Sequence, residues 1–399
     1  MIRYFSHCIT LCVLLWPLGH CAPAAAMVLA PRPQMGFNNW NSTHCREEFS
    51  ETMIRGIADR LVTLGLRDIG YTYVNLDDCW AEPDRDPQGN LVVNHQRFPG
   101  GLKRLADYIH AKGLKFGLYT SAGSFTCQKR EEGGFPGALG HEMQDAALMA
   151  SLGVDYLKYD NCNHGALDAG QRYRAMALAL RRSGREILYS VCEWGENRPW
   201  LWAAEPDIDA NSWRTTGDIE DSFQSLLKIY NENVVLDAYA RPGHWNDPDM
   251  LEVGNGGMSS TEYRSHFSLW AIMAAPLLIG TDLRKIDPAA LAILSNREVI
   301  AIDQDALGAQ GKRIRNQVDA QVIVKPLFDG SRAVALFNPS DHAATITIAA
   351  TELGLEEANH YAVRDLWRHT SRNSTAAISA QVPAHATVLY RIRATQRGQ

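Results

Sequence analysis

The stretch MQDAALMASLGVDYLKYDNCN, residues 143–163, decides the fold of this chain. Met143, Ala147 and Ala150 repeat at helical spacing, Gly153 then ends the helix, and YLKYD (156–160) has the pattern of a buried strand. The same order of amphipathic helix, glycine and short apolar strand recurs along the chain. It predicts further strands at YTYVNLD (71–77), KFGLYT (115–120) and EILYSVC (186–192). Alternation of this kind predicts right-handed crossovers and a parallel sheet.

Four more segments complete a set of eight strand candidates: MGFNNW (35–40), DANSW (209–213), HWNDPDM (244–250) and APLLIG (275–280). The region that contains them is close to the ~250 residues of a (β/α)8 TIM barrel. An open doubly wound sheet is the alternative, but its glycine-rich dinucleotide fingerprint is absent. From about residue 313, short alternating runs without helices predict an antiparallel β-domain. We therefore expect a barrel over 27–308 and a β-domain over 309–399.

The start of the chain has the features of a secretory signal peptide, which we expect to span residues 1–26. Arg3 precedes a mostly apolar run, and three alanines end at Ala26. A bacterial lipoprotein signal with Cys21 at its cleavage site is the alternative. We expect the mature protein to be secreted or periplasmic. A net charge of −6 argues against nucleic acid or an anionic membrane as a partner. No later segment is apolar enough to cross a membrane.

Five cysteines remain after the signal: Cys45, Cys79, Cys127, Cys162 and Cys192. In an exported protein they favour disulfides, and their odd number leaves at least one thiol unpaired. The lack of a C-x-x-C pair argues against structural zinc. Sequons begin at Asn41 and Asn373, and they matter only if the source is eukaryotic.

Acidic residues follow six of the eight predicted strands, at the ends where a barrel enzyme has its active site. Any single acid there could be a helix cap. A rim that also carries Trp, Tyr, Lys and Arg points instead to glycoside hydrolysis, which needs two carboxyl groups. Metal-dependent hydrolysis is the alternative, but no H-x-H or H-x-x-x-H pair is present. Lys158 and Asp160 share one strand face, so the lysine is expected to favour the ionised carboxylate.

The motifs MGFNNWN, NLDDCW, YLKYDNC, SVCEWG and HWNDPDML stand in the order found in glycoside hydrolase family 27. The chain resembles this family of retaining α-galactosidases and α-N-acetylgalactosaminidases over nearly its whole length after the signal. The resemblance implies a TIM barrel followed by a C-terminal β-sandwich, hydrolysis of terminal α-galactosides with retention, and no metal or organic cofactor. It also implies disulfides Cys45–Cys79 and Cys127–Cys162, which leave Cys192 as the free thiol.

The resemblance assigns roles at the barrel mouth. Asp160 is expected to be the nucleophile, and Asp218 the general acid and base. The residues expected to bind the sugar are Trp40, Asp77, Asp78, Tyr119, Lys158, Cys192, Trp194, Arg214, Asp249 and Met250. Expected substrates are galacto-oligosaccharides or galactomannans, and the protein is expected to be a monomer or a homodimer.

Three alternatives remain open within and beyond this family. Trp194 and the following loop resemble the bulky form of the pocket that admits only a 2-hydroxyl group, which disfavours an α-N-acetylgalactosaminidase. A β-L-arabinopyranosidase is expected to change an acid after the second strand, whereas Asp77 and Asp78 are both kept. A galactose-binding protein without catalysis is expected to lack one catalytic aspartate, and here both are present.

Overall fold

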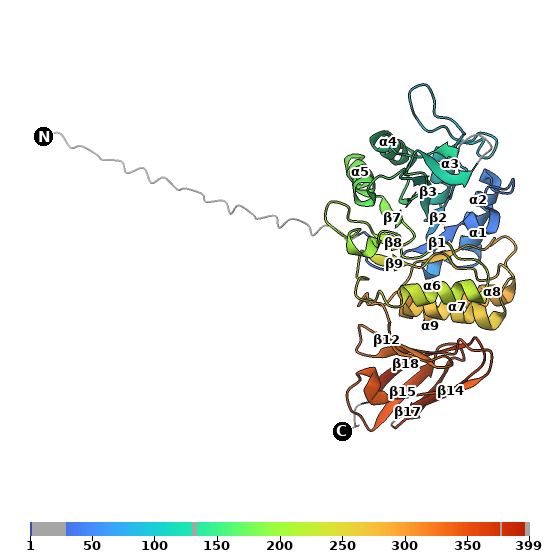
Figure 1. Ribbon diagram of the computed structural model, residues 1–399, viewed down its shortest axis with the longest axis vertical. Helices are drawn as coiled ribbons and strands as arrows, with labels where there is room; N and C mark the ends of the chain where they lie inside the picture. The colour runs from blue at the N-terminus through green and yellow to red at the C-terminus, as the bar shows by residue number, and fades with distance from the viewer. Residues whose placement is uncertain (2–28, 130–133, 376, 396–399) are drawn as a thin grey trace.

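The computed structural model describes residue 1 and residues 29–129, 134–375 and 377–395. The predicted signal, with its cleavage site, therefore lies outside the described residues except for Met1. In Figure 1 strands in the upper part of the molecule are surrounded by helices, and a separate β-domain lies below them. A layer that contains α6, α7 and α9 separates the two.

Within the described residues, eight parallel strands form the upper sheet in the order β10-β1-β2-β3-β6-β7-β8-β9. They are β1 (Met35–Asn38), β2 (Tyr73–Asn75), β3 (Lys115–Ser121), β6 (Tyr156–Asp160), β7 (Leu188–Cys192), β8 (Ser212–Arg214), β9 (Trp245–Asp247) and β10 (Leu277–Ile279). A parallel bridge between Leu251 and Ile279 joins the segment after β9 to β10. The sheet is therefore a closed barrel, and the open-sheet alternative is wrong.

Six of the eight strands fall inside the predicted segments, and β3 and β8 each extend one residue beyond theirs. The helices are α1 (Trp40–Thr43), α2 (Glu51–Thr63), α3 (Leu102–His110), α4 (Glu142–Leu152), α5 (Ala169–Arg182), α6 (Phe223–Asn233), α7 (Ser260–Ile272), α8 (Pro288–Leu294) and α9 (Arg297–Asp303). The side chain of Ser50 accepts a hydrogen bond from the Met53 N–H and so caps α2. Gly153, which follows α4, has φ +85°, the left-handed conformation that ends many helices.

A short hairpin after β3 was not predicted. It pairs β4 (Phe125–Lys129) with β5 (Gly134–Pro136). Cys127 lies in β4, so this hairpin brings one half of a disulfide to the barrel mouth.

The C-terminal domain is antiparallel, as predicted. A six-stranded sheet has the order β11 (Lys312–Asn316), β12 (Gln321–Pro326), β13 (Arg332–Phe337), β18 (Thr387–Thr395), β15 (His360–Asp365) and β16 (Thr370–Ser374). β14 (Ala344–Ala349) pairs with β17 (Ala377–Val382) as a second, two-stranded sheet. Apolar side chains from both sheets share one core that includes Val334, Ile346, Ile378 and Ile392.

Helix α7 joins the two domains. The Ser265 hydroxyl donates to the backbone oxygen of His385, and the Trp367 indole N–H donates to Ser268 Oγ at 2.8 Å. From α6, the Tyr230 hydroxyl donates to Gln321 on β12 at 2.8 Å. These contacts fix the β-domain against the helices on the outside of the barrel.

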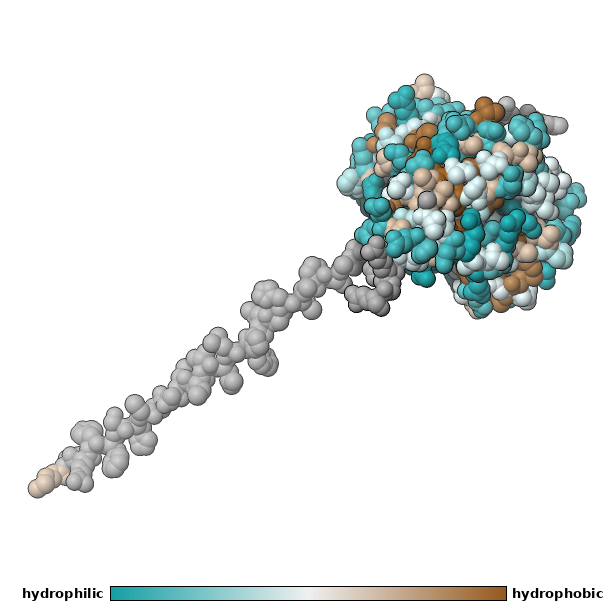
Figure 2. Space-filling view, turned by 90° about the horizontal axis from the view of Figure 1, so that it is seen from below, coloured by the Kyte–Doolittle hydropathy of each residue, from teal (hydrophilic) through white to brown (hydrophobic). Residues whose placement is uncertain are grey.

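One face of the molecule is shown in Figure 2. Hydrophilic residues dominate this face, and hydrophobic ones form small separate patches. Among the described residues, none of the helices combines the length and the apolar character needed to cross a membrane.

Candidate active site

Asp160 ends β6 at the barrel mouth, and its side chain is held by two donors. The Tyr119 hydroxyl, from the neighbouring strand β3, donates to Oδ2 at 2.9 Å, and the Asn161 backbone N–H donates to Oδ1 at 2.9 Å. Asp160 is only 5% exposed. Each carboxylate oxygen therefore has a fixed direction, which is what a positioned nucleophile requires.

Lys158 lies on the same strand but does not donate to Asp160. Its ammonium group donates to Asp77 Oδ2 at 2.8 Å and lies 5.3 Å from the centre of the Tyr119 ring. Asn38 donates to the same oxygen of Asp77 at 2.8 Å. Lys158 therefore acts on Asp160 through its charge and not through a hydrogen bond, and residues from β1, from the segment after β2 and from β6 meet at Asp77.

Arg214 is the centre of a second group of charges. Its Nη2 lies 2.9 Å from Asp218 Oδ1 and 3.1 Å from Asp249 Oδ2. The Ile219 backbone N–H donates to Asp249 at 2.9 Å. One buried guanidinium therefore ties the loop after β8, which carries Asp218, to the segment after β9.

Cys192, at the end of β7, is the free thiol among the described cysteines, as the resemblance implied. It is buried, and Arg214 Nη1 lies 3.7 Å from its sulfur. Burial raises the pKa of the Cys192 thiol, and the nearby charge of Asp160 raises it further. The thiol is therefore neutral and lines the site without acting as a nucleophile.

The remaining predicted residues lie at the same end of the barrel. Trp40 begins α1, with its backbone N–H bonded to Asn38 Oδ1 at 2.8 Å. The carboxylate of Asp78 accepts from the Gln128 backbone N–H at 3.0 Å. Met250 lines a small cavity of about 10 Å³ together with Lys158, Arg214 and Asp249. Trp194 follows Cys192 by two residues, and beyond this the described contacts do not connect it to the cluster.

The two predicted catalytic carboxyl groups have pKa values shifted in opposite directions. Burial raises the pKa of Asp160 and outweighs the charge of Lys158, which lowers it as predicted. The negative charge of Asp218 raises it further. Partial burial raises the pKa of Asp218, but Arg214 and Lys158 outweigh it and hold this pKa below its usual value.

Both implied disulfides are formed, Cys45–Cys79 and Cys127–Cys162. The second lies beside Asp160, because the sulfurs of Cys127 and Cys162 and the Asp160 carboxylate lie within 4.8 Å of one another. These three side chains have the spacing of a metal site. The sulfurs are bonded to each other, however, so they offer no thiolate to a metal ion.

Several residues that support the site were not predicted. Besides Asn38, the Asn39 side chain accepts from the Asp77 backbone N–H at 2.8 Å, and Arg172 donates to the Asn161 side chain at 2.8 Å. Asn246 and Asp247 are buried on β9. The asparagines in the motifs NNW and DNC could have indicated these supporting contacts. An amide side chain beside a buried strand needs hydrogen-bond partners, so such residues are expected to hold their neighbours in place.

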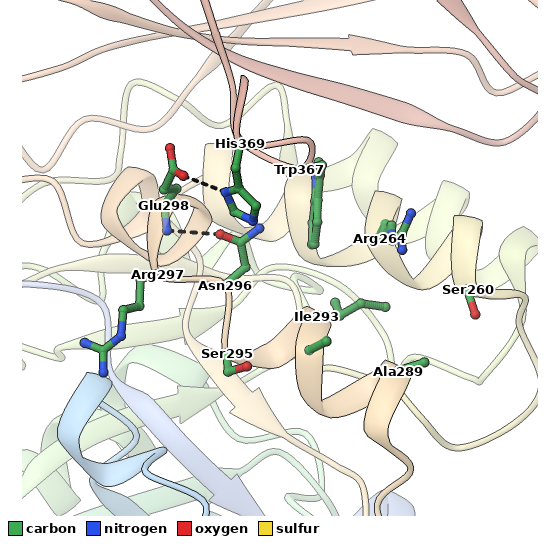
Figure 3. A pocket seen from close by; sticks show the side chains of 11 residues that line it. Ser260, Arg264, Ala289, Ile293, Ser295, Asn296, Arg297, Glu298, Trp367 and His369 are labelled. Carbon is green, nitrogen blue, oxygen red and sulfur yellow. Dashed lines mark hydrogen bonds and ion pairs between the residues drawn. The ribbon is translucent and has the colours of Figure 1, made fainter. Parts of the chain in front are cut away.

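The largest described cavity lies elsewhere, as Figure 3 shows. It has a volume of about 620 Å³ and is lined by α7, α8, α9 and the turn between β15 and β16. Glu298 in its wall pairs with His369 and, at 2.8 Å, with Arg364. None of the predicted site residues lines this groove, so it belongs to the contact between the two domains.

Comparison with known proteins agrees with this geometry. A family model described as alpha galactosidase A matches residues 32–305, and one described as the alpha galactosidase C-terminal beta sandwich domain matches residues 317–392. The α-galactosidase of Coffea arabica is 52% identical over 359 residues, which cover 90% of this chain and 93% of the relative. The α-galactosidase of Cyamopsis tetragonoloba is 49% identical over 363 residues, which cover 91% and 86%.

Solved structures share the fold. α-Galactosidase I from Mortierella vinacea has a TM-score of 0.88 and 37% identity, covering 94% of this chain and 100% of that one. The Saccharomyces cerevisiae α-galactosidase solved with raffinose has a TM-score of 0.85 and 31% identity, covering 92% and 98%. A β-L-arabinopyranosidase from Geobacillus stearothermophilus, at 24% identity and a TM-score of 0.82, shows likeness of fold alone.

A barrel mouth with two interacting carboxyl groups, set among a lysine, an arginine and a tyrosine, defines a glycoside hydrolase. The chain belongs to the α-galactosidases of glycoside hydrolase family 27.

Proposed function

We propose that this α-galactosidase releases terminal α-galactose with retention, with Asp160 as the nucleophile and Asp218 as the general acid and base. The observation that carries the proposal is the contrast between the two carboxyl groups. Asp160 is buried and held by two donors, whereas the side chain of Asp218 is 68% exposed and pairs with Arg214. A nucleophile must be fixed, and an acid must reach a leaving group that extends into solvent.

In the first step an Asp160 oxygen attacks the anomeric carbon as the bond to the leaving oxygen breaks, and Asp218 gives that oxygen its proton. The product is a galactosyl ester of Asp160. In the second step Asp218, now a carboxylate, takes a proton from water while the water oxygen attacks the anomeric carbon and the ester bond breaks. Two inversions give retention. Tyr119 stays hydrogen-bonded to Asp160 and steadies it between steps.

The groups around Asp160 would grip the sugar. Asp77 accepts hydrogen bonds, and Lys158 and Arg214 donate them, so together they can pair with several galactose hydroxyls. The pair Asp77 and Asp78 favours a galactoside over a β-L-arabinopyranoside, and Trp194 disfavours an N-acetyl group. The S. cerevisiae relative was solved with raffinose, which supports galacto-oligosaccharides as substrates. Galactomannan side chains carry the same terminal sugar.

Two disulfides support export of the enzyme, because such bonds persist in oxidising compartments. We propose that it acts outside the cytoplasm, as a monomer or a homodimer, after removal of residues 1–26. Mass spectrometry of the mature N-terminus and light scattering of the purified enzyme test these two points.

The catalytic roles are tested by Asp160→Asn and Asp218→Asn. We expect Asp218→Asn to lower kcat/KM for raffinose by about 10²- to 10⁴-fold, the usual contribution of general acid catalysis. The loss should be smaller for p-nitrophenyl α-galactoside, whose leaving group needs little proton assistance. Asp160→Asn should abolish turnover of both substrates. Near-normal turnover by either variant would refute its assigned role, and β-galactose as the first product in NMR would refute retention.

A further inference from the structure

We propose that Glu252 is a positioning residue for the sugar site, because its carboxylate fastens the segment that carries Trp40 to the segment that carries Asp249 and Met250. This inference rests on the proposed function and on the expectation from the sequence that these three residues bind the sugar. Neither the sequence motifs nor the predicted site included Glu252.

The carboxylate of Glu252 bridges two parts of the chain that are 211 residues apart. Asn41, which directly follows Trp40 on α1, donates its amide N–H to Oε1. Asn255, three residues after Glu252, donates to Oε2. Each oxygen thus has an amide donor, and one of the two donors comes from the segment after β1, which lies on the other side of β10.

The backbone of the Glu252 segment is fixed independently of that side chain. Its N–H donates to His266 Nε2 on α7 at 3.0 Å. The Leu251 N–H donates to Leu278 O at 2.7 Å, and the Trp270 indole N–H donates to Asp249 O at 2.8 Å. The segment is therefore anchored to β10 and α7. Through its hydrogen bond with Asn41, the Glu252 side chain links this fixed segment to the neighbouring residue Trp40.

Close packing makes the position of Asn41 sensitive to this link. A Cβ added at Gly280, on the end of β10, would lie only 3.1 Å from Asn41 Cβ. Asn41 therefore lies against the backbone of β10, and its amide has little freedom to find another acceptor. A displaced Asn41 would carry Trp40 with it.

Glu252 is an unusual choice for a buried clamp. It is 3% exposed, and among the described residues no lysine or arginine pairs with it. Burial raises the pKa of Glu252 to about 7; the Asn255 and Asn41 hydrogen bonds oppose this rise, while Asp221 and Asp249 add to it. His266 faces the same segment, and burial lowers its pKa to about 3, so it supplies no positive charge. A buried acid without a cation is costly, which argues for a use that an amide cannot supply.

That use is the acceptance of two amide donors at once. A carboxylate can accept at both oxygens, whereas a glutamine of the same size accepts at one and presents its own N–H₂ group at the other. Glu252→Gln should therefore keep the packing and lose one side of the clamp. A protonated Glu252 side chain also accepts at only one oxygen. The KM of the variant should therefore differ from that of the wild type mainly above pH 7, where Glu252 is ionised.

The experiment compares wild type, Glu252→Gln and Asn41→Ala with p-nitrophenyl α-galactoside between pH 5 and pH 8.5. At pH 8 we expect Glu252→Gln to raise KM about tenfold, the effect of losing one charge-assisted hydrogen bond, with a smaller change in kcat. At pH 5.5 the difference from wild type should shrink to less than about threefold. Asn41→Ala should raise KM at both pH values, and the double variant should be no worse than Asn41→Ala alone.

The matched control is Glu298→Gln, which removes a carboxylate at the contact between the domains. It should leave KM unchanged at both pH values, and thermal unfolding of every variant checks the fold. Equal KM values for wild type and Glu252→Gln at pH 8, or the same loss at pH 5.5 and pH 8, would overturn the proposal. Calorimetric binding of galactose separates it from the catalytic assignment, because a wrong role for Asp160 would leave the weaker binding by Glu252→Gln intact.

Discussion

At the residue scale, the pKa values of Asp160 and Asp218 in the unliganded site are shifted against the directions that their proposed roles favour. The proposed mechanism needs Asp160 ionised and Asp218 protonated. Burial raises the pKa of Asp160, and Arg214 with Lys158 holds the pKa of Asp218 low in spite of partial burial. Because 68% of the Asp218 side chain is open to water, a bound sugar can cover it and disfavour its charged form.

These two pKa shifts predict a difference between the pH profiles of kcat and kcat/KM. If Asp218 is the general acid, the basic limb of the kcat/KM profile reports loss of its proton in the free enzyme. The basic limb of the kcat profile then reports loss of the same proton in the enzyme–substrate complex. Substrate should raise the pKa of Asp218, so the basic limb of kcat should lie at higher pH than that of kcat/KM. Steady-state rates on raffinose from pH 3 to pH 9 measure both. Coincident limbs would mean that the sugar does not cover Asp218.

The sequence named the acids at the barrel mouth but not their hydrogen-bond partners. Asp160 stands in the motif YLKYDNC, so its place at the end of a strand could be predicted. That Lys158 pairs with Asp77 depends on neighbouring strands, since Lys158 lies beside Tyr119 in the sheet and both face the end of β2. Sequence spacing within one strand cannot show a partner on another.

At the scale of elements, glycine stops and apolar runs predicted the strands β2, β3, β6 and β7, because buried parallel strands are apolar on both faces. Two strands of the β-domain, β11 and β16, lack such an apolar pattern. β16 is open to solvent along most of its length, and β11 alternates exposed with half-buried residues without apolar anchors. Their pairing comes from the neighbouring strands and not from their own composition.

The disulfide Cys127–Cys162 should stabilise the elements around Asp160. It closes a span of 35 residues between the β4 hairpin and the loop after β6. Replacing both cysteines by serine should lower the free energy of unfolding by about 2–4 kcal/mol. Urea unfolding measures this loss, with Cys45→Ser/Cys79→Ser as the matched control because its span of 34 residues is nearly equal. An unchanged urea midpoint for the first variant would contradict the prediction.

At the scale of the whole molecule, two buried ionisable groups lie where barrel and β-domain meet. Asp303 ends α9, and Lys325 lies on β12, with its ammonium group donating to Asp303 O at 3.4 Å and Ala271 O at 3.5 Å. Burial raises the pKa of Asp303 and lowers that of Lys325, and each charge partly offsets this effect on the other. The two domains therefore interact through these ionisable groups as well as through packing.

Removing one of these groups should cost more than removing both. Lys325→Met leaves the buried Asp303 carboxyl group without the cation that offsets its burial, so we expect a loss of about 1–3 kcal/mol in the free energy of unfolding. Asp303→Asn/Lys325→Met should recover most of it. Thermal and urea unfolding of the three proteins measure the difference. A double variant that is less stable than Lys325→Met would show that the two charges act separately.

The central claim is that Asp160 forms the bond to galactose. It is tested most directly by mass spectrometry after incubation with a fluorinated α-galactosyl substrate whose glycosyl-enzyme hydrolyses slowly. The account predicts one fluorinated galactosyl group per chain, located on the peptide that contains Asp160, and none on the Asp160→Asn variant. A label on another carboxylate, or a label on Asp160→Asn equal to that on the wild type, would contradict it.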